Sequence, residues 1–364
     1  MIGALWGLAL GAGLAASGQE LTRPVMEPAL RTSQQAVPAP AQEGELRVQR
    51  LQTTVMGTEL IMEVWHATEE VARRALAAAE RELRRVEDLM TDWRPSPLLD
   101  LCAAAGRGPQ PVDKELVDVL GLSLEVAELT DGAFDPTCAA VGRLWDWRAE
   151  PPLVPTNGDL SQALDGVGWR RLSVDRERSS VSLQPGTQLG LGGIAKGYGV
   201  DRAMAVLMAE GVEHALVNAG GDLKALGRLG GSELWEIAIR HPRDRQRIIA
   251  AIPLSNSCVA TSGDYERFFE LDGVRYHHIL DPRTGRPATG CMSATVLAPD
   301  AALADALATA LCVLGPARGL KLIESLPRVE ALLVDMDGVV RKSTGLTVRE
   351  LGEDQAGGSA PGAE

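Results

Sequence analysis

Aromatic residues make up only 4 % of this 364-residue chain, and cysteine and histidine occur five times each. The five cysteines are widely separated and show neither a disulfide framework nor a zinc-ligand spacing, which favours buried thiols. Basic residues are in the minority: the formal net charge is -13 and no long basic run occurs, which argues against a nucleic-acid-binding surface. The 45 % hydrophobic content is enough to bury a sizeable core.

The segment at residues 276–287, YHHILDPRTGRP, places titratable side chains at the end of an apolar strand and just before a constrained turn. The ring of Pro282 and the permissive backbone of Gly285 fix that turn, so we expect His278 and Asp281 to be held in place. Titratable side chains held at such a turn indicate that chemistry takes place there. The alternative is an ordinary hairpin whose histidine is a half-buried strand residue.

Residues 191–201, LGGIAKGYGVD, form a glycine-rich turn that leads into a helix. Such a turn can present backbone N–H groups and a helix N-terminus to an anion, and Lys196 adds a positive charge. The spacing matches neither the Rossmann nor the Walker pattern. A plain strand-to-helix connection would explain the segment equally well.

Asp305 and Thr309 are four residues apart in a helix expected at residues 299–313. This spacing places a carboxylate and a hydroxyl on one face of the helix. Hard oxygen ligands of this kind suit Mg²⁺, which usually completes its coordination with water and substrate phosphate. The alternative is a surface Asp with a Thr that bonds back to its own helix.

Taken in order, these segments and several others resemble the ApbE family of FAD:protein FMN transferases. The resemblance covers roughly residues 48–344. The further matching blocks are MGT at 56–58, GAFDPT at 132–137, NAGGD at 218–222 and TSGDY at 261–265. Each block is moderately specific, whereas the ordered set is highly specific.

The resemblance implies an enzyme that cleaves FAD at its pyrophosphate, releases AMP and attaches FMN to a threonine of an acceptor flavoprotein, with Mg²⁺ required. It implies that Asp305, Thr309 and the backbone carbonyl of Gly193 bind the metal. It also implies that His278 is the base that deprotonates the acceptor threonine, a role that suits an imidazole. FAD enters as a substrate, and Mg²⁺ is the cofactor. A Mg²⁺-dependent FAD pyrophosphatase and a non-catalytic flavin-binding protein are the alternatives.

The resemblance also places a set of residues against FAD, and most of them are apolar, as a flat ring system requires. These residues are Met56, Trp93, Ala133, Phe134, Asp135, Gly190, Lys196 and Leu280. Two positions depart from the family pattern. Gly190 stands where the family usually has an acidic residue, and Trp93 to Pro97 replace a Tyr-Arg segment that is followed by Ser-Glu. The acidic FAD also needs positive charge nearby, for which Lys196, Arg202, Arg283 and Arg286 are candidates.

The resemblance implies an α+β fold of the ApbE type, related to the T-fold, with mixed sheets flanked by helices and an active site in a cleft between subdomains. Helices are expected at residues 68–90 and 113–129, and strands at 46–55, 58–65, 172–183, 215–217, 235–240, 248–253, 267–271, 274–280 and 293–298. The mixture of strands, hairpins and helices agrees with α+β rather than with a regular β-α-β array.

The ends of the chain differ in composition from its centre. Residues 1–18 look like a signal peptide without its basic start, and they are too short for a confident membrane span. Residues 19–44 are expected to form a flexible linker, 45–348 the flavin transferase domain and 349–364 a disordered tail. An exported, periplasmic or extracytoplasmic protein without a stable membrane span is therefore expected, with a cytoplasmic one as the alternative.

Overall fold

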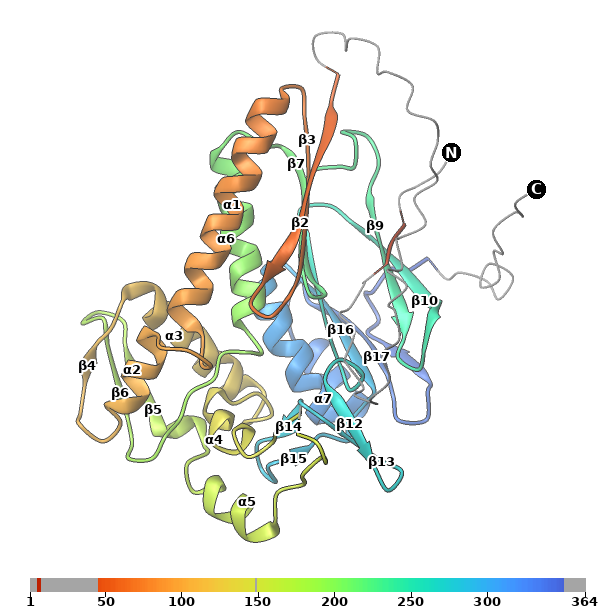
Figure 1. The fold of residues 1–364 in the computed structure, drawn as a ribbon. Coiled ribbons are helices and arrows are strands. Elements are labelled where there is room, and N and C mark those ends of the chain that lie inside the picture. Colours follow the sequence, from red (N-terminus) through yellow and green to blue (C-terminus); the bar gives the residue numbers. More distant parts are fainter. Residues whose placement is uncertain (1–4, 8–44, 148, 350–364) are drawn as a thin grey trace.

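The computed structural model describes residues 5–7, 45–147 and 149–349, and its centre is an eight-stranded antiparallel sheet (Figure 1). In spatial order the strands are β18 (Val340–Lys342), β17 (Glu330–Val334), β16 (Ser293–Ala298), β11 (Ser257–Gly263), β8 (Asp222–Leu226), β7 (His214–Ala219), β3 (Thr58–His66) and β2 (Arg47–Val55). Strands far apart in the sequence are neighbours in this order, so the sheet brings the early and late motifs together.

The hairpin between β2 and β3 shows how the sequence sets local geometry. Val55 pairs with Thr58, so Met56 and Gly57 alone form the loop. Both have positive φ, 52° and 68°, as a two-residue hairpin loop with the favoured twist requires. The turn carries Met56 to the end of the sheet, where it reaches the cavity described below.

Three long helices, α1 (Glu69–Met90), α6 (Ala195–Ala209) and α7 (Ala301–Ile323), cover one face of the sheet (Figure 1). In α1 the buried side chains recur at helical spacing, including Ala72, Ala75, Ala79 and Leu83. Small residues bring α6 and α7 together: a Cβ on Gly197 would lie 2.1 Å from the carbonyl oxygen of Ala301. The close approach places the start of α6 directly beside the start of α7.

Helix α7 is the one helix among the described residues that is long and apolar enough to cross a membrane by length and composition. Of its most apolar stretch, 56 % is buried within the protein, as expected for a core helix. Gly315 interrupts the helix with φ 69° and ψ 176°, just before Pro316. The first segment therefore ends close to the predicted boundary at Val313.

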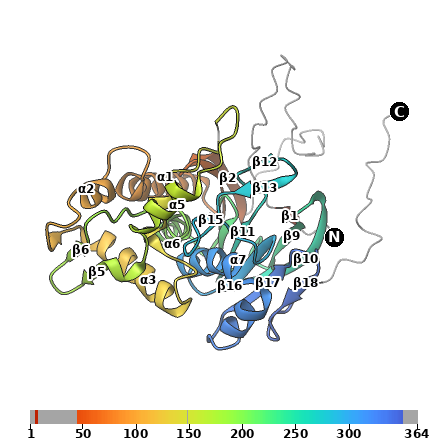
Figure 2. The same cartoon turned by 90° about the horizontal axis from the view of Figure 1, so that it is seen from below.

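The remaining helices and most small sheets lie near the lower end of the central sheet in Figure 1, whereas a three-stranded sheet packs against the face opposite the long helices (Figures 1 and 2). The helices are α2 (Pro97–Ala103), α3 (Lys114–Leu129), α4 (Ala139–Gly142), α5 (Asn157–Leu164) and the 3-10 turns η1 (Pro136–Cys138) and η2 (Trp169–Arg171). One small sheet is β4 (Gln110–Pro111), β6 (Ser180–Leu183) and β5 (Leu172–Asp175); another is β1 (Leu5–Gly7), β9 (Trp235–His241) and β10 (Asp244–Leu254). Two hairpins complete the fold: β12 (Phe268–Leu271) with β13 (Val274–His277), and β14 (Leu280–Asp281) with β15 (Arg286–Pro287).

The predicted α+β class is confirmed, and the two predicted N-terminal strands and helices α1 and α3 are found within one or two residues of their expected bounds. The expected strand at 172–183 is wrong, because positive φ at Ser179 closes it into the hairpin β5–β6. The expected strand at 274–280 is divided: β13 ends at His277 and pairs with β12, whereas β14 begins at Leu280 and pairs with β15. Strands β8, β11, β17 and β18 were not predicted.

All five cysteines are free thiols, and all but Cys138 are buried, which confirms that expectation. The expected linker and the tail from residue 350 lie outside the described residues. So does the expected leader, apart from residues 5–7, which pair in parallel with β9 as β1.

Candidate active site

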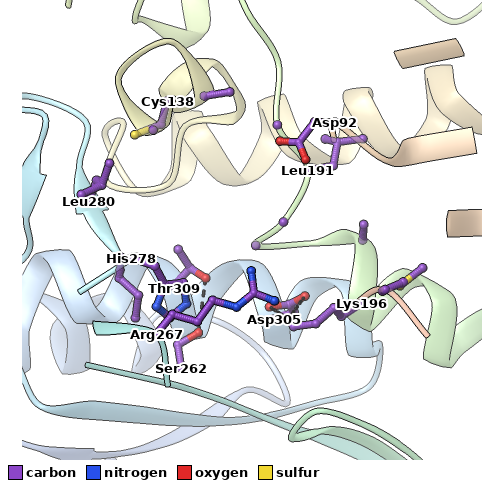
Figure 3. A pocket seen from close by; sticks show the side chains of 18 of the residues that line it. Asp92, Cys138, Leu191, Lys196, Ser262, Arg267, His278, Leu280, Asp305 and Thr309 are labelled. Carbon is purple, nitrogen blue, oxygen red and sulfur yellow. Dashed lines mark hydrogen bonds and ion pairs between the residues drawn. The ribbon is translucent and has the colours of Figure 1, made fainter. Parts of the chain in front are cut away.

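A cavity of about 340 Å³ opens between the central sheet with α6 and α7 on one side and the segment from α1 to α4 on the other. On the side of the central sheet, the lining comes from the Met56 turn, the glycine-rich turn, β11 and the first turns of α7. The loop after α1, the residues before η1 and the loop before β14 complete it (Figure 3). The structure brings all twelve predicted site residues to it: Met56, Trp93, Ala133, Phe134, Asp135, Gly190, Gly193, Lys196, His278, Leu280, Asp305 and Thr309.

Lys196, Asp222 and Asp305 form a buried charged cluster on one wall. The Nζ atom of Lys196 donates to Asp222 Oδ2 at 2.5 Å and to both carboxylate oxygens of Asp305 at 3.1 Å. Both aspartates are 1 % exposed, and the backbone N–H of Gly197 also donates to Asp305 at 3.2 Å. The cluster joins α6, β8 and α7 through a lysine that faces the cavity.

If both carboxylates were ionised, the single ammonium would leave this cluster with an excess negative charge. Burial, with repulsion by Asp305, raises the pKa of Asp222 to about 8, although Lys196 opposes the shift. Burial alone would lower the pKa of Lys196, but the two carboxylates outweigh it and raise that pKa. Lys196 therefore stays charged, and a second cation would relieve the remaining repulsion.

The atoms available to such a cation are hard oxygen donors. The hydroxyl of Thr309 lies one helical turn from Asp305, 3.3 Å from the Ser262 hydroxyl. A Cβ on Gly193 would be 3.0 Å from Thr309 Oγ1, so the glycine backbone approaches the same hydroxyl closely. Asp305 is buried and Thr309 faces the cavity, so the alternative of a surface pair is excluded.

This donor set fits Mg²⁺ better than a softer metal. Within the described residues, no group of three or more His, Cys, Asp and Glu side chains is placed to hold a metal ion. A site with one or two carboxylates, a hydroxyl and a carbonyl leaves coordination positions for water and phosphate oxygens, which is the usual arrangement for Mg²⁺.

His278 lies across the cavity from the glycine-rich turn, in the chain between β13 and β14 (Figure 3). Its neighbours desolvate it, and the positive charges of Arg267 and Lys196 also lower its pKa below the ordinary value. The side chain is exposed to the cavity, so solvent limits that depression. A neutral imidazole at physiological pH is a competent proton acceptor.

The Pro282–Gly285 turn holds Asp281 as expected, whereas the backbone N–H of His278 donates to the carbonyl of Arg267 at 3.0 Å. Gly285 has φ 66°, and its N–H donates to the carbonyl of Asp281 at 2.8 Å. The carboxylate of Asp281 accepts from the backbone and the guanidinium of Arg283. Asp281 therefore stabilises the turn, while His278 faces the cavity.

Apolar side chains line other parts of the cavity, and they include Met56, Phe134 and Leu280. Trp93 stands at the rim with 59 % of its surface exposed. The carboxylate of Asp135 is fully used within the protein: it accepts from the N–H and hydroxyl of Thr137 and from the N–H of Trp169. Asp135 therefore shapes this wall by fixing the loop.

The expected positive charges only partly reach the cavity. Lys196 does, but Arg202 pairs with Glu82, Arg283 with Asp281 and Arg286 with Asn157, all outside the cavity lining. None of these three candidate arginines lines the cavity, and each interacts with a partner elsewhere. Arg267 lines the cavity instead, and its positive charge lowers the pKa of His278.

Sequence reasoning therefore missed Arg267, Asp222, Ser262 and Asp92 as residues of the site. Asp222 lies in the block NAGGD and Ser262 in the block TSGDY. The blocks therefore indicated these segments but gave neither residue a role in the site. Arg267 carried no signal, because it reads as an ordinary residue of an expected strand.

Comparison with known proteins places this fold in a class of flavin transferases. A flavin transferase ApbE from Vibrio cholerae has a similar structure, with a TM-score of 0.73 and 30 % identity over 82 % of this chain and 98 % of its own. An ApbE protein from Thermotoga maritima has a TM-score of 0.75 and 35 % identity over 82 % of this chain and 97 % of its own.

The sequence comparisons agree. The model of the ApbE family matches residues 56–333, and the chain belongs to that family. A relative from Treponema pallidum, an FAD:protein FMN transferase, is 39 % identical over 70 % of this chain and 75 % of its own length. A relative from Klebsiella pneumoniae, also an FAD:protein FMN transferase, is 33 % identical over 79 % of this chain and 89 % of its own length.

Proposed function

We propose that this protein is an FAD:protein FMN transferase that uses Mg²⁺ to move FMN from FAD to a threonine of an acceptor flavoprotein. The observation that carries the proposal is the cavity that holds the Lys196–Asp222–Asp305 cluster, the Thr309 hydroxyl and the His278 imidazole together. Membership of the ApbE family and the activity of the similar relatives support the same reaction.

The oxygen atoms of Asp305, Thr309 and the Gly193 backbone would hold Mg²⁺. When bound, the ion supplies positive charge to the pyrophosphate oxygens of FAD. Lys196 and Arg267 border the same place and add charge from the protein. Because Lys196 is fixed by two carboxylates, its ammonium is already oriented when the substrate enters.

His278 takes the proton of the acceptor threonine. The threonine oxygen forms a bond to the phosphorus of the FMN half, the bond from that phosphorus to the AMP oxygen breaks, and AMP leaves with the electron pair. A threonine hydroxyl is a weak nucleophile, so removal of its proton is the step that the imidazole assists. Its lowered pKa keeps His278 unprotonated before the acceptor arrives.

The test incubates purified protein with FAD, Mg²⁺ and an acceptor domain that carries the threonine motif, and measures the intact mass of the acceptor. We expect a gain of one FMN that EDTA abolishes and that an acceptor lacking the threonine does not show. Free FMN and AMP with an unchanged acceptor would make the protein a pyrophosphatase for that acceptor. Unaltered FAD would leave only flavin binding.

We also propose that the protein is exported. The apolar first 17 residues followed by a linker-like composition support this localisation. The N-terminal mass of the protein recovered from the periplasm of a bacterial host would test it. Removal of about the first 18 residues is expected, and an intact N-terminus in the cytoplasm would contradict export.

A further inference from the structure

Asp92 is one of the carboxylates that line the cavity and that the reaction described above does not use. It follows directly on the C-cap of α1 at Thr91, whose N–H donates to the carbonyl of Glu87 at 2.9 Å and whose own carbonyl accepts from the Ser96 hydroxyl. These bonds fix the backbone on both sides of it. The side chain is half-buried and lines the cavity, where Figure 3 shows it near Leu191.

Among the described residues, Asp92 has no hydrogen bond or ion pair to another side chain. Asp305, Asp222 and Asp135 all have close protein partners, as described above. Arg143 and Arg267 are near enough to act on Asp92 electrostatically, but Arg143 donates to Gln188. Burial raises the pKa of Asp92, and a hydrogen bond from its own backbone N–H only partly offsets that shift.

Gly190 makes the space for this carboxylate. A Cβ on Gly190 would lie 3.1 Å from Asp92 Oδ2 and 3.0 Å from the Cβ of Ala139. The glycine cannot move away, because its N–H donates to the carbonyl of Pro136 at 2.9 Å and the N–H of Leu189 donates to the sulfur of Cys102 at 3.2 Å. A side chain at position 190 would therefore compete with Asp92 for one place on the cavity wall.

We propose that Asp92 is a specificity-determining residue that accepts a hydrogen bond from an N–H group of FAD. The dinucleotide offers such donors at both ends, in the imide of the isoalloxazine ring and in the amino group of adenine. The phosphates of FAD are negatively charged, so the Asp92 carboxylate repels them. They are expected beside the ammonium of Lys196 instead. The carboxylate reaches the ligand from the loop after α1, through the space that Gly190 leaves open.

The proposal rests on the proposed function, and an exchange of the two residues tests it. Equilibrium binding of FAD, FMN and ADP is measured without acceptor for the wild type, Asp92→Ala, Gly190→Asp and the double variant. Loss of a hydrogen bond to a charged group weakens binding by about tenfold to a hundredfold, which we expect for Asp92→Ala with FAD. Gly190→Asp should also bind weakly, because two carboxylates are then crowded together.

The double variant is the decisive measurement. It removes the Asp92 carboxylate that would crowd a side chain at position 190, and it supplies a new carboxylate from Asp at position 190. The affinity for FAD should therefore recover to well above that of either single variant. A purely structural role of Asp92 would give no recovery. Selective loss of FMN binding in Asp92→Ala assigns the bond to the flavin imide, and selective loss of ADP binding assigns it to adenine.

Asp88→Ala is the matched control. Asp88 is an exposed acidic residue one helical turn earlier, where it pairs with Arg94 outside the cavity lining. This variant should bind FAD like the wild type. Equal FAD affinity for Asp92→Ala and wild type would overturn the role of Asp92 and leave the transferase intact, whereas a wild type that binds no FAD would overturn both.

Discussion

The imidazole of His278 is the group on which transfer to threonine depends most directly. His278→Ala should lower the rate of FMN transfer by about 10² to 10⁴, the usual contribution of a general base. FAD affinity should change much less, because the imidazole acts on the acceptor. Single-turnover transfer followed by intact mass, beside equilibrium FAD binding, separates the two effects. Equal loss of binding and transfer would make His278 a binding residue.

The pH dependence of the same group follows from the direction of its pKa shift. A lowered pKa means that His278 loses its proton, and becomes a base, at a lower pH than an ordinary histidine, whose value is 6.5. The value of kcat/KM should therefore begin to fall only below pH 6.5 as the solution is made more acidic. Above pH 6.5 it should keep its full value. A fall at or above 6.5, absent from His278→Ala, would show that positive charge does not depress this group.

Gly193 and Gly192 offer a matched pair for the metal site. An added Cβ at Gly193 meets Thr309 Oγ1 at 3.0 Å and Phe134 at 3.3 Å, whereas one at Gly192 meets nothing within 4 Å. Gly193→Ala should weaken Mg²⁺ binding by about tenfold or more, since displaced ligand groups commonly cost that much. Gly192→Ala should bind like the wild type. Calorimetric titration with Mg²⁺ measures both, and equal affinities would remove Gly193 from the site.

At the scale of elements, the contact between α6 and α7 is what places Lys196 beside Asp305. The contact depends on Gly197, where a Cβ would lie 2.1 Å from the carbonyl oxygen of Ala301. A Gly→Ala change inside a helix normally stabilises it by about 1 kcal/mol. At position 197 the helices must separate, and overpacking typically costs about 1–3 kcal/mol.

Gly197→Ala should therefore lower the free energy of unfolding in urea despite the gain in helix propensity. The control is Gly158→Ala in α5, an exposed helical glycine whose nearest contact would be an ordinary 3.7 Å to Thr156 Oγ1. That variant should be neutral or slightly more stable. If both variants behave alike, the α6–α7 contact is looser than the structure indicates.

At the scale of the whole molecule, the buried cluster couples stability to pH and metal. A pKa of about 8 for Asp222, against an ordinary 3.8, means that the native protein keeps a proton that the unfolded chain has lost. Stability of the metal-free protein should fall as the pH rises from about 4 to 8 and level off above. Bound Mg²⁺ would replace that proton, so its stabilising effect should grow over the same range.

Thermal unfolding with and without Mg²⁺ near pH 6 and above pH 8 checks this coupling. The gain in Tm should be larger at the higher pH. Asp222→Asn keeps a hydrogen-bond acceptor for Lys196 but cannot titrate, so the difference between the two pH values should shrink. A gain that is the same at both pH values in the wild type would contradict the excess charge of the cluster.

The sequence by itself determined the elements whose patterns are local. The apolar spacing of α1 and the Met56–Gly57 turn gave their positions within a residue or two, because helix periodicity and hairpin chemistry depend on near neighbours. The ordered motifs also identified the residues of one site before their positions were known. Short central strands such as β8 and β11 were missed, because their pairing depends on distant strands.

Only the tertiary structure decided which charges meet in the cavity. Asp222 and Asp305 are 83 residues apart in sequence, and burial brings both to one lysine, so their coupling has no local signal. The same reason explains why Arg267 reaches the cavity while three expected arginines do not. The contact between Asp92 and Gly190 likewise depends on the packing of two loops that are distant in sequence. Residue spacing along the chain therefore could not predict it.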